Sequence, residues 1–200
     1  MSRTDTQESN KIKSPIKRYI TFSGDEGVWE YWDGEKNVQM ESLEFIVMDT
    51  RSSIGGWSEI HKSRIYSNMV KSTVKSPFTV RAGKTVINEG LYSDIKNDVI
   101  AAGGKFTTNI LALAWIDGEL TPVDVQLSAA CLRDWSAFVE ASGNIFAVYK
   151  GTVSASRGEQ QKKGAVKYYT PNFILGELAD ADSGAANEFC SEILMPYLNQ

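Results

Sequence analysis

The stretch "KFTTNILALAWIDGELTPVDVQL", residues 105–127, decides the fold class of this chain. Its centre, residues 109–116, is apolar at both alternating positions, which is typical of a central strand that is covered on both faces. Asp117-Gly118 then interrupts the apolar pattern, and this dipeptide is a strong signal for a tight turn between antiparallel strands. The stretch therefore predicts a β-hairpin at the centre of a sheet.

Shorter strands and three helices surround this hairpin in the sequence. Further strands are predicted at residues 18–24, on both sides of the turn Asp33-Gly34, at 79–90, at 144–153 and at 165–178. Apolar residues spaced three and four apart predict helices at 90–104, at 128–143 with Ser128 as a cap, and at 183–198 between Ser183 and Pro196. The polar residues 154–164 are expected to form a mobile loop between two strands.

This order of elements predicts a mainly β fold with added helices, in the α+β class. An OB-type antiparallel barrel with an inserted helix and a C-terminal helix fits the order, and an unrelated α+β sheet remains the alternative. Residues 1–18 are polar and aperiodic, so we expect a flexible basic N-terminal arm before a single OB-like domain at 19–200. No apolar run approaches the roughly 20 residues that cross a membrane, and the chain is expected to be cytoplasmic.

Charge is sorted into blocks along the chain, although the net charge is only -4. Residues 19–50 hold one base and eight acids, whereas residues 51–84 hold seven bases and one acid. Residues 150–167 hold five bases and one acid, and from 168 to the end there are five acids and no base. Such segregation produces a local positive field within a Debye length of about 8 Å, even in an acidic protein.

Several kinds of catalytic or cofactor site are not supported by the sequence. One histidine and two separated cysteines give no cluster with metal-ligand spacing, and Cys131 and Cys190 lie in apolar surroundings as expected for free buried thiols. The string "RAGKT" at 81–85 lacks the first glycine of a phosphate-binding loop. The acids of residues 32–44 are typical of a solvated strand face. We therefore expect no enzyme activity, no cofactor and no metal.

The two basic blocks also contain aromatic residues, and this combination is typical of proteins that hold single-stranded nucleic acid. Cations contact phosphates, while bases stack on exposed rings. Stacking candidates are Trp57, Tyr66 and Tyr149, and Trp57 and Tyr66 are alternatively core-capping residues. Phosphate-contact candidates are Arg51, Lys62, Arg64, Lys71, Lys75, Lys150, Arg157, Lys162, Lys163 and Lys167.

Two segments resemble the OB-fold single-stranded DNA-binding proteins encoded by tailed phages and prophages. They are "GGWSEIHKSRIYSNMV" at 55–70 and "FTVRAGKTVINEGLYSDIKNDVIAAGGKFTTNILAL" at 78–113, and the similarity extends over about 19–175. The resemblance implies sequence-independent binding of single-stranded DNA in phage replication or recombination, in the host bacterial cytoplasm. Candidate partners are single-stranded DNA, replication or recombination proteins and further copies of the chain. The apolar-faced end "MPYLNQ" differs from the free acidic tail of many such proteins.

Two other functions fit the sequence. The adjacent acidic and basic blocks would suit contacts between subunits of a virion structural or assembly protein. Alternatively, the acids of residues 32–45 would bind Mg²⁺ in a nuclease.

Overall fold

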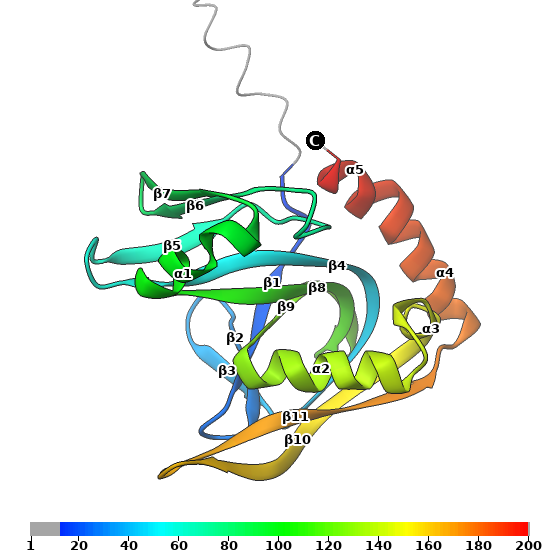
Figure 1. Cartoon of the computed structure of the whole chain (residues 1–200). Helices are drawn as coiled ribbons and strands as arrows, with labels where there is room; N and C mark the ends of the chain where they lie inside the picture. Colours follow the sequence, from blue (N-terminus) through cyan, green and yellow to red (C-terminus); the bar gives the residue numbers. More distant parts are fainter. Residues whose placement is uncertain (1–12, 200) are drawn as a thin grey trace, which may run out of the picture.

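One mixed β-sheet dominates the computed structural model, which describes residues 13–199 (Figure 1). Along its main path the strands follow the order β3-β2-β1-β9-β8-β4-β5-β6-β7, and all neighbours are antiparallel except β1 and β9. The strands are β1 (Arg18–Ser23), β2 (Val28–Trp32), β3 (Asn37–Met40), β4 (Ser42–Ser58), β5 (Ser63–Ser67), β6 (Phe78–Ala82), β7 (Thr85–Gly90), β8 (Gly104–Ile116), β9 (Glu119–Ser128), β10 (Gly151–Lys163) and β11 (Val166–Glu177). The mainly β class with added helices is confirmed.

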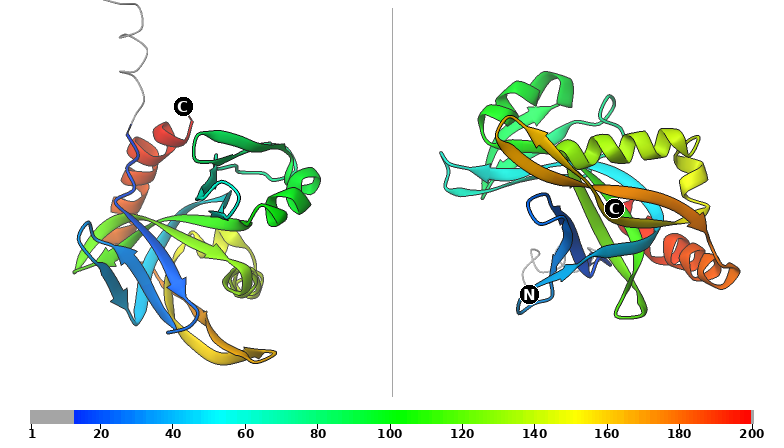
Figure 2. Two further views of the ribbon diagram at one scale, coloured as in Figure 1. Left: turned by 90° about the vertical axis from the view of Figure 1, so that its left-hand side faces the viewer. Right: turned by 90° about the horizontal axis from the view of Figure 1, so that it is seen from below.

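Helices lie on both faces of the central strands. They are α1 (Tyr92–Ala101), α2 (Ala129–Ala141), α3 (Ile145–Val148), α4 (Asp180–Phe189), the π-helix η1 (Cys190–Leu194) and α5 (Met195–Leu198). The views of Figure 2 place α1 and α2 on one face and the C-terminal helices on the other. None of the helices in the described part is long and apolar enough to cross a membrane.

The predicted central strand is β8, between β9 and β4. Ile110, Ala112 and Ala114 point into the main core, which also contains Trp135 of α2. Leu113 points the other way and packs with Ala186 of α4. Burial on both faces thus explains the continuous apolar run.

β4 serves two parts of the sheet. Its first part pairs with β10 and β8, and its last part pairs with β5 and β8. The register shifts between Val47 and Asp49, where a β-bulge bends the strand. Beyond the bulge, Ile54 joins Ile65, Phe78 and the α1 residues in a second core. We call the part formed by the end of β4, β5–β7, α1 and the start of β8 the lobe.

The sheet is not the closed antiparallel barrel that the sequence suggested. β10 pairs with the first part of β4 and β11 pairs with β10, so six strands follow each other in the order β1-β9-β8-β4-β10-β11. Strand pairing over residues 13–199 leaves β11 and β1 unpaired with each other, and the backbone N–H of Tyr169 donates to the Gly24 carbonyl (2.7 Å) across that gap. The parallel β1–β9 pair makes the sheet mixed.

Some local predictions were wrong. Residues 145–148 form α3, whose N-terminus is capped by the Asn144 side chain, instead of a strand. Residues 154–163 extend β10 instead of forming a loop. The last helix begins at Asp180 rather than near Ser183. The π-helical turn Cys190–Leu194 joins α4 to α5, and α5 continues past Pro196 to Leu198. Of the expected N-terminal arm, residues 1–12 lie outside the described part, and Arg18 already belongs to β1.

Candidate nucleic-acid interface

The exposed side of the lobe carries aromatic and cationic residues together. Arg64 lies opposite Trp57, and Tyr66 lies opposite Arg81 of β6. Directly opposed side chains point to the same side of a sheet. Lys105 of β8 lies opposite Gly55, two residues before Trp57 on β4, so Lys105 and Trp57 point to the same side of the sheet. We call these five residues the sheet face.

The opposite side of the same strands explains why the sheet face is exposed. Ile54, Ile65 and Val80 point into the second core beneath α1, and each is at most 1% exposed. Alternation then directs Trp57 and Tyr66 to solvent, where they are 52% and 45% exposed. Both rings therefore present a surface on which a base can stack.

A cavity of 220 Å³ lies beside the sheet face, on the outer side of β8 and β9. Its lining residues come from five strands, which are β1, β9, β8, β4 and β5. Thr21 of β1 lies opposite Gln126 of β9, and Ser128 of β9 lies opposite Thr107 of β8. Burial raises the pKa of the cavity residue Cys131 to about 11, so its thiol stays protonated at neutral pH and is a poor nucleophile. We call this space the β8–β9 cavity; its lining is Thr21, Phe22, Gly55, Gly56, Arg64, Lys105, Thr107, Gln126, Ser128 and Cys131.

A buried hydrogen-bond network leads to the β8–β9 cavity. The Ser53 hydroxyl contacts Asn109 Oδ1 (2.6 Å), and Asn109 Nδ2 donates to Asp124 Oδ2 (2.8 Å). Gln126 Nε2 donates to the same carboxylate oxygen (2.9 Å). Burial raises the pKa of Asp124, while the hydrogen bonds from Gln126 and Asn109 oppose that shift. Asp124 Oδ1 has no hydrogen-bond partner among the described residues.

The second basic block lies on the hairpin of β10 and β11, which we call the ribbon. Lys162 is directly opposite Lys167, and Gln160 is opposite Tyr169. The alternation of a strand places these four side chains on one face of the ribbon. The guanidinium of Arg157 lies over the Tyr169 ring, 5.2 Å from its centroid. We call these five residues the ribbon face.

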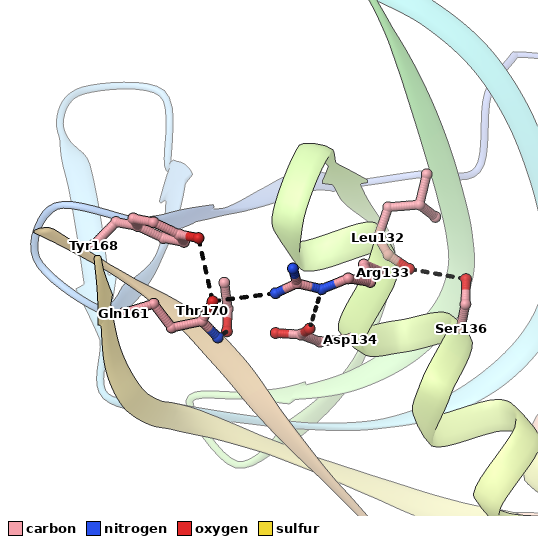
Figure 3. Close-up of polar contacts among 7 residues, drawn as sticks. All are labelled: Leu132, Arg133, Asp134, Ser136, Gln161, Tyr168 and Thr170. Atoms are coloured by element: carbon pink, nitrogen blue, oxygen red, sulfur yellow. Dashed lines mark hydrogen bonds and ion pairs between the residues drawn. The ribbon is translucent and has the colours of Figure 1, made fainter. Parts of the chain in front are cut away.

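The other face of the ribbon is docked onto α2 (Figure 3). Arg133 Nη2 donates to Gln161 Oε1 (3.1 Å), and the Tyr168 hydroxyl donates to the same oxygen (3.2 Å). Gln161 Nε2 donates to Thr170 Oγ1 (3.0 Å), and Arg133 also pairs with Asp134. These bonds fix the direction in which the ribbon extends.

The ribbon and the β4–β5 hairpin project from the same side of the molecule, at the left in Figure 1 and in the right-hand view of Figure 2. β1 connects them, since Thr21 lines the β8–β9 cavity and Gly24 accepts the hydrogen bond from Tyr169. The turn after β1 also carries the exposed acids Asp25 and Glu26. The sheet face therefore borders the β8–β9 cavity, whereas the ribbon is linked to it through β1 and lies near an acidic turn.

Arg51 and Lys71 lie apart from both groups and share a buried partner. Arg51 Nε contacts Asp49 Oδ2 (2.8 Å), and Lys71 Nζ contacts Asp49 Oδ1. Asp49 is 3% exposed, so Arg51 and Lys71 supply the contacts that its buried carboxylate needs. Both also line a different cavity with Trp135, between α2 and β4.

The remaining predicted residues are also dispersed. The hydroxyl of Tyr149 lies 3.5 Å from Thr50 Oγ1, and its ring packs against the main core. Lys150 precedes β10, at the end away from the ribbon tip, and Lys75 precedes β6. Lys62 pairs with Glu59 (2.6 Å) at the β4–β5 turn. Lys163 lies opposite Val166, on the ribbon side away from Lys162.

The candidate residues chosen from the sequence did not include Lys105, Arg81 or Tyr169. A signal for Lys105 was present, because Lys105, Thr107 and Asn109 are polar at alternating positions just before the apolar run. The contribution of Arg81 and Tyr169 depends on strand register, which the sequence does not display.

One of the acids considered for a metal site, Asp33, has a structural role in a turn. Asp33 accepts hydrogen bonds from the backbone N–H groups of Lys36 and Glu35, and these bonds lower its pKa. Within residues 13–199, no three His, Cys, Asp or Glu side chains gather as metal ligands. Comparison with protein-family models, curated proteins and solved structures finds no match.

Proposed function

We propose that this chain binds single-stranded DNA without sequence preference. The observation that carries the proposal is the sheet face, on which Trp57 and Tyr66 are exposed among Arg64, Arg81 and Lys105. Stacking of a base on an aromatic ring contributes about 1–3 kcal/mol, and every base has a face that stacks. The cations supply phosphate contacts, which carry no sequence information.

The ribbon face supports the same proposal from electrostatics. Lys162 and Lys167 are directly opposed, and like charges in this position destabilise a strand pair. A stretch of phosphate backbone along this face would replace the repulsion by one attractive phosphate contact for each lysine. Arg157 stacks on Tyr169, so the rest of this face offers a cation beside an aromatic ring.

We further propose that the fold is an OB-type barrel with an open side. β4, β8 and β9 would be its first three strands, α2 the helix before the fourth strand, and β10 the fourth. In OB-folds, the second and third strands and two connecting loops bind oligonucleotides. The corresponding parts here are the outer side of β8 and β9, the lobe and the ribbon tip, which hold the cavity and both basic groups. The resemblance to phage proteins adds a role in replication or recombination.

Titration of a fluorescent oligo-dT at two salt concentrations tests the proposal. We expect salt-sensitive binding, about tenfold weaker in Trp57→Ala, with circular dichroism unchanged because the ring is exposed. Trp32→Ala, which removes another exposed ring from β2, is the matched control. Absence of binding by the wild type at low salt would refute the function. Polymerisation without nucleic acid would favour the virion assembly alternative.

A further inference from the structure

The β8–β9 cavity is lined by both apolar and polar groups, as small-molecule sites are. Phe22 and Cys131 supply apolar surface, while Thr107, Gln126 and Ser128 supply polar atoms. A nucleobase has the same mixed character, because its faces are apolar and its edge carries hydrogen-bonding groups. The cavity is therefore chemically suited to one base.

Gln126 is held in place by residues beneath the cavity. One N–H of its amide donates to Asp124, which is 2% exposed and also accepts from Asn109. Asn109 is fixed in turn by Ser53. The amide retains a second N–H donor and its Oε1 acceptor for another partner. A positioned side chain loses less conformational freedom when it binds, so each hydrogen bond it makes is more effective.

We infer that the β8–β9 cavity holds one unstacked nucleobase of a bound single strand, and that the Gln126 amide hydrogen-bonds its pairing edge. The inference rests on the proposed function. An adjacent donor and acceptor can meet the pairing edge of each base, so this contact does not demand one sequence. In a duplex that edge is occupied and the base is stacked. Gln126 therefore selects single strands over duplexes.

The cavity rim supports this placement. Arg64 and Lys105 line the cavity, and both also belong to the sheet face with Trp57. A base in the cavity would have its phosphates beside these cations, and a neighbouring base would be near the exposed indole. Stacking, phosphate contact and edge recognition would then act on consecutive nucleotides.

The test compares three probes by fluorescence anisotropy: oligo-dT, an abasic deoxyribose-phosphate chain of equal length and charge, and a duplex. Gln126→Leu removes the amide, and Thr107→Leu fills the cavity. We expect each variant to weaken oligo-dT binding about tenfold, which corresponds to the loss of one well-placed hydrogen-bonding group. Binding of the abasic chain, binding of the duplex and the salt slope should be unchanged. Gln39→Leu is the control, since this amide on β3 also contacts carboxylates, those of Glu26 and Glu30.

Each outcome separates the two proposals. If wild-type protein binds oligo-dT and both cavity variants bind it equally well, the cavity assignment is overturned while the function stands. Equal losses on oligo-dT and on the abasic chain also overturn it, since no base would be involved. If the wild type binds no oligonucleotide, the proposed function itself fails. Should circular dichroism reveal that Gln126→Leu is unfolded, Thr107→Leu alone decides.

Discussion

Neutralising the opposed lysines of the ribbon face should reduce the salt dependence of binding by a calculable amount. Lys162 and Lys167 lie directly across the ribbon, so both reach one stretch of phosphate backbone. Each phosphate neutralised on a single strand contributes about 0.7 to the slope of log affinity against log salt. Lys162→Gln with Lys167→Gln should therefore make the slope shallower by about 1.4. Between 50 and 200 mM salt, the fold-change in affinity should shrink by about sevenfold.

The assay is an oligo-dT titration at four salt concentrations, together with thermal melting. Because the double variant removes a repulsive pair, its melting temperature should be unchanged or higher, so weaker binding is not explained by unfolding. Lys96→Gln is the matched control, since Lys96 lies on α1, which covers the opposite face of the lobe. Two results would refute the reasoning: a slope equal to that of the wild type, or an equal loss of affinity at every salt concentration.

Two further predictions concern stability. Burial raises the pKa of Asp124 in the native state, so its carboxyl favours folding below the unfolded-state pKa, and this contribution is lost as pH rises through the native pKa. Between pH 3 and 7, the free energy of unfolding of Asp124→Asn should therefore fall less, or rise more, than that of the wild type. Urea titrations measure this difference, and equal pH dependence of the two proteins would disprove the prediction. A Cβ on Gly103 would lie 2.2 Å from the Trp57 carbonyl oxygen, whereas one on Gly118 meets nothing within 4 Å, and both residues have positive φ. Gly118→Ala should cost about 1–2 kcal/mol and Gly103→Ala distinctly more, and equal costs in thermal melts would contradict the contact.

The centre of the fold could be predicted from the sequence because its signals are local. The apolar run of β8, the Asp117-Gly118 turn and the spacing in α1 and α2 each lie within one element. The strand at 165–178 was predicted and is β11, but the extension of β10 over 154–163 was missed, because β10 is polar on both faces beyond Arg157, where no core supplies a periodic pattern. Barrel closure depends on pairing between distant strands, which the sequence does not display.

The candidate site was predictable only in part for a similar reason. Arg64 and Tyr66 lie two residues apart, so their common face follows from strand periodicity, whereas Trp57 joins them through the pairing of β4 with β5. Arg51 belongs to the same basic block, yet the bulge and a buried acid direct it to an ion pair. Lys105 reaches the sheet face through pairing between β4 and β8, across a large separation in the chain.

The point at which the chain enters and leaves the lobe has a consequence for protein engineering. Gly56 and Gly104 face each other across β4 and β8, and neighbouring strands are about 5 Å apart. A tight turn therefore suffices to join these positions, and the lobe has a core of its own. Exchange of the segment between these two glycines as a cassette would therefore have to supply new apolar partners for Ile54 and Phe106, which remain on β4 and β8.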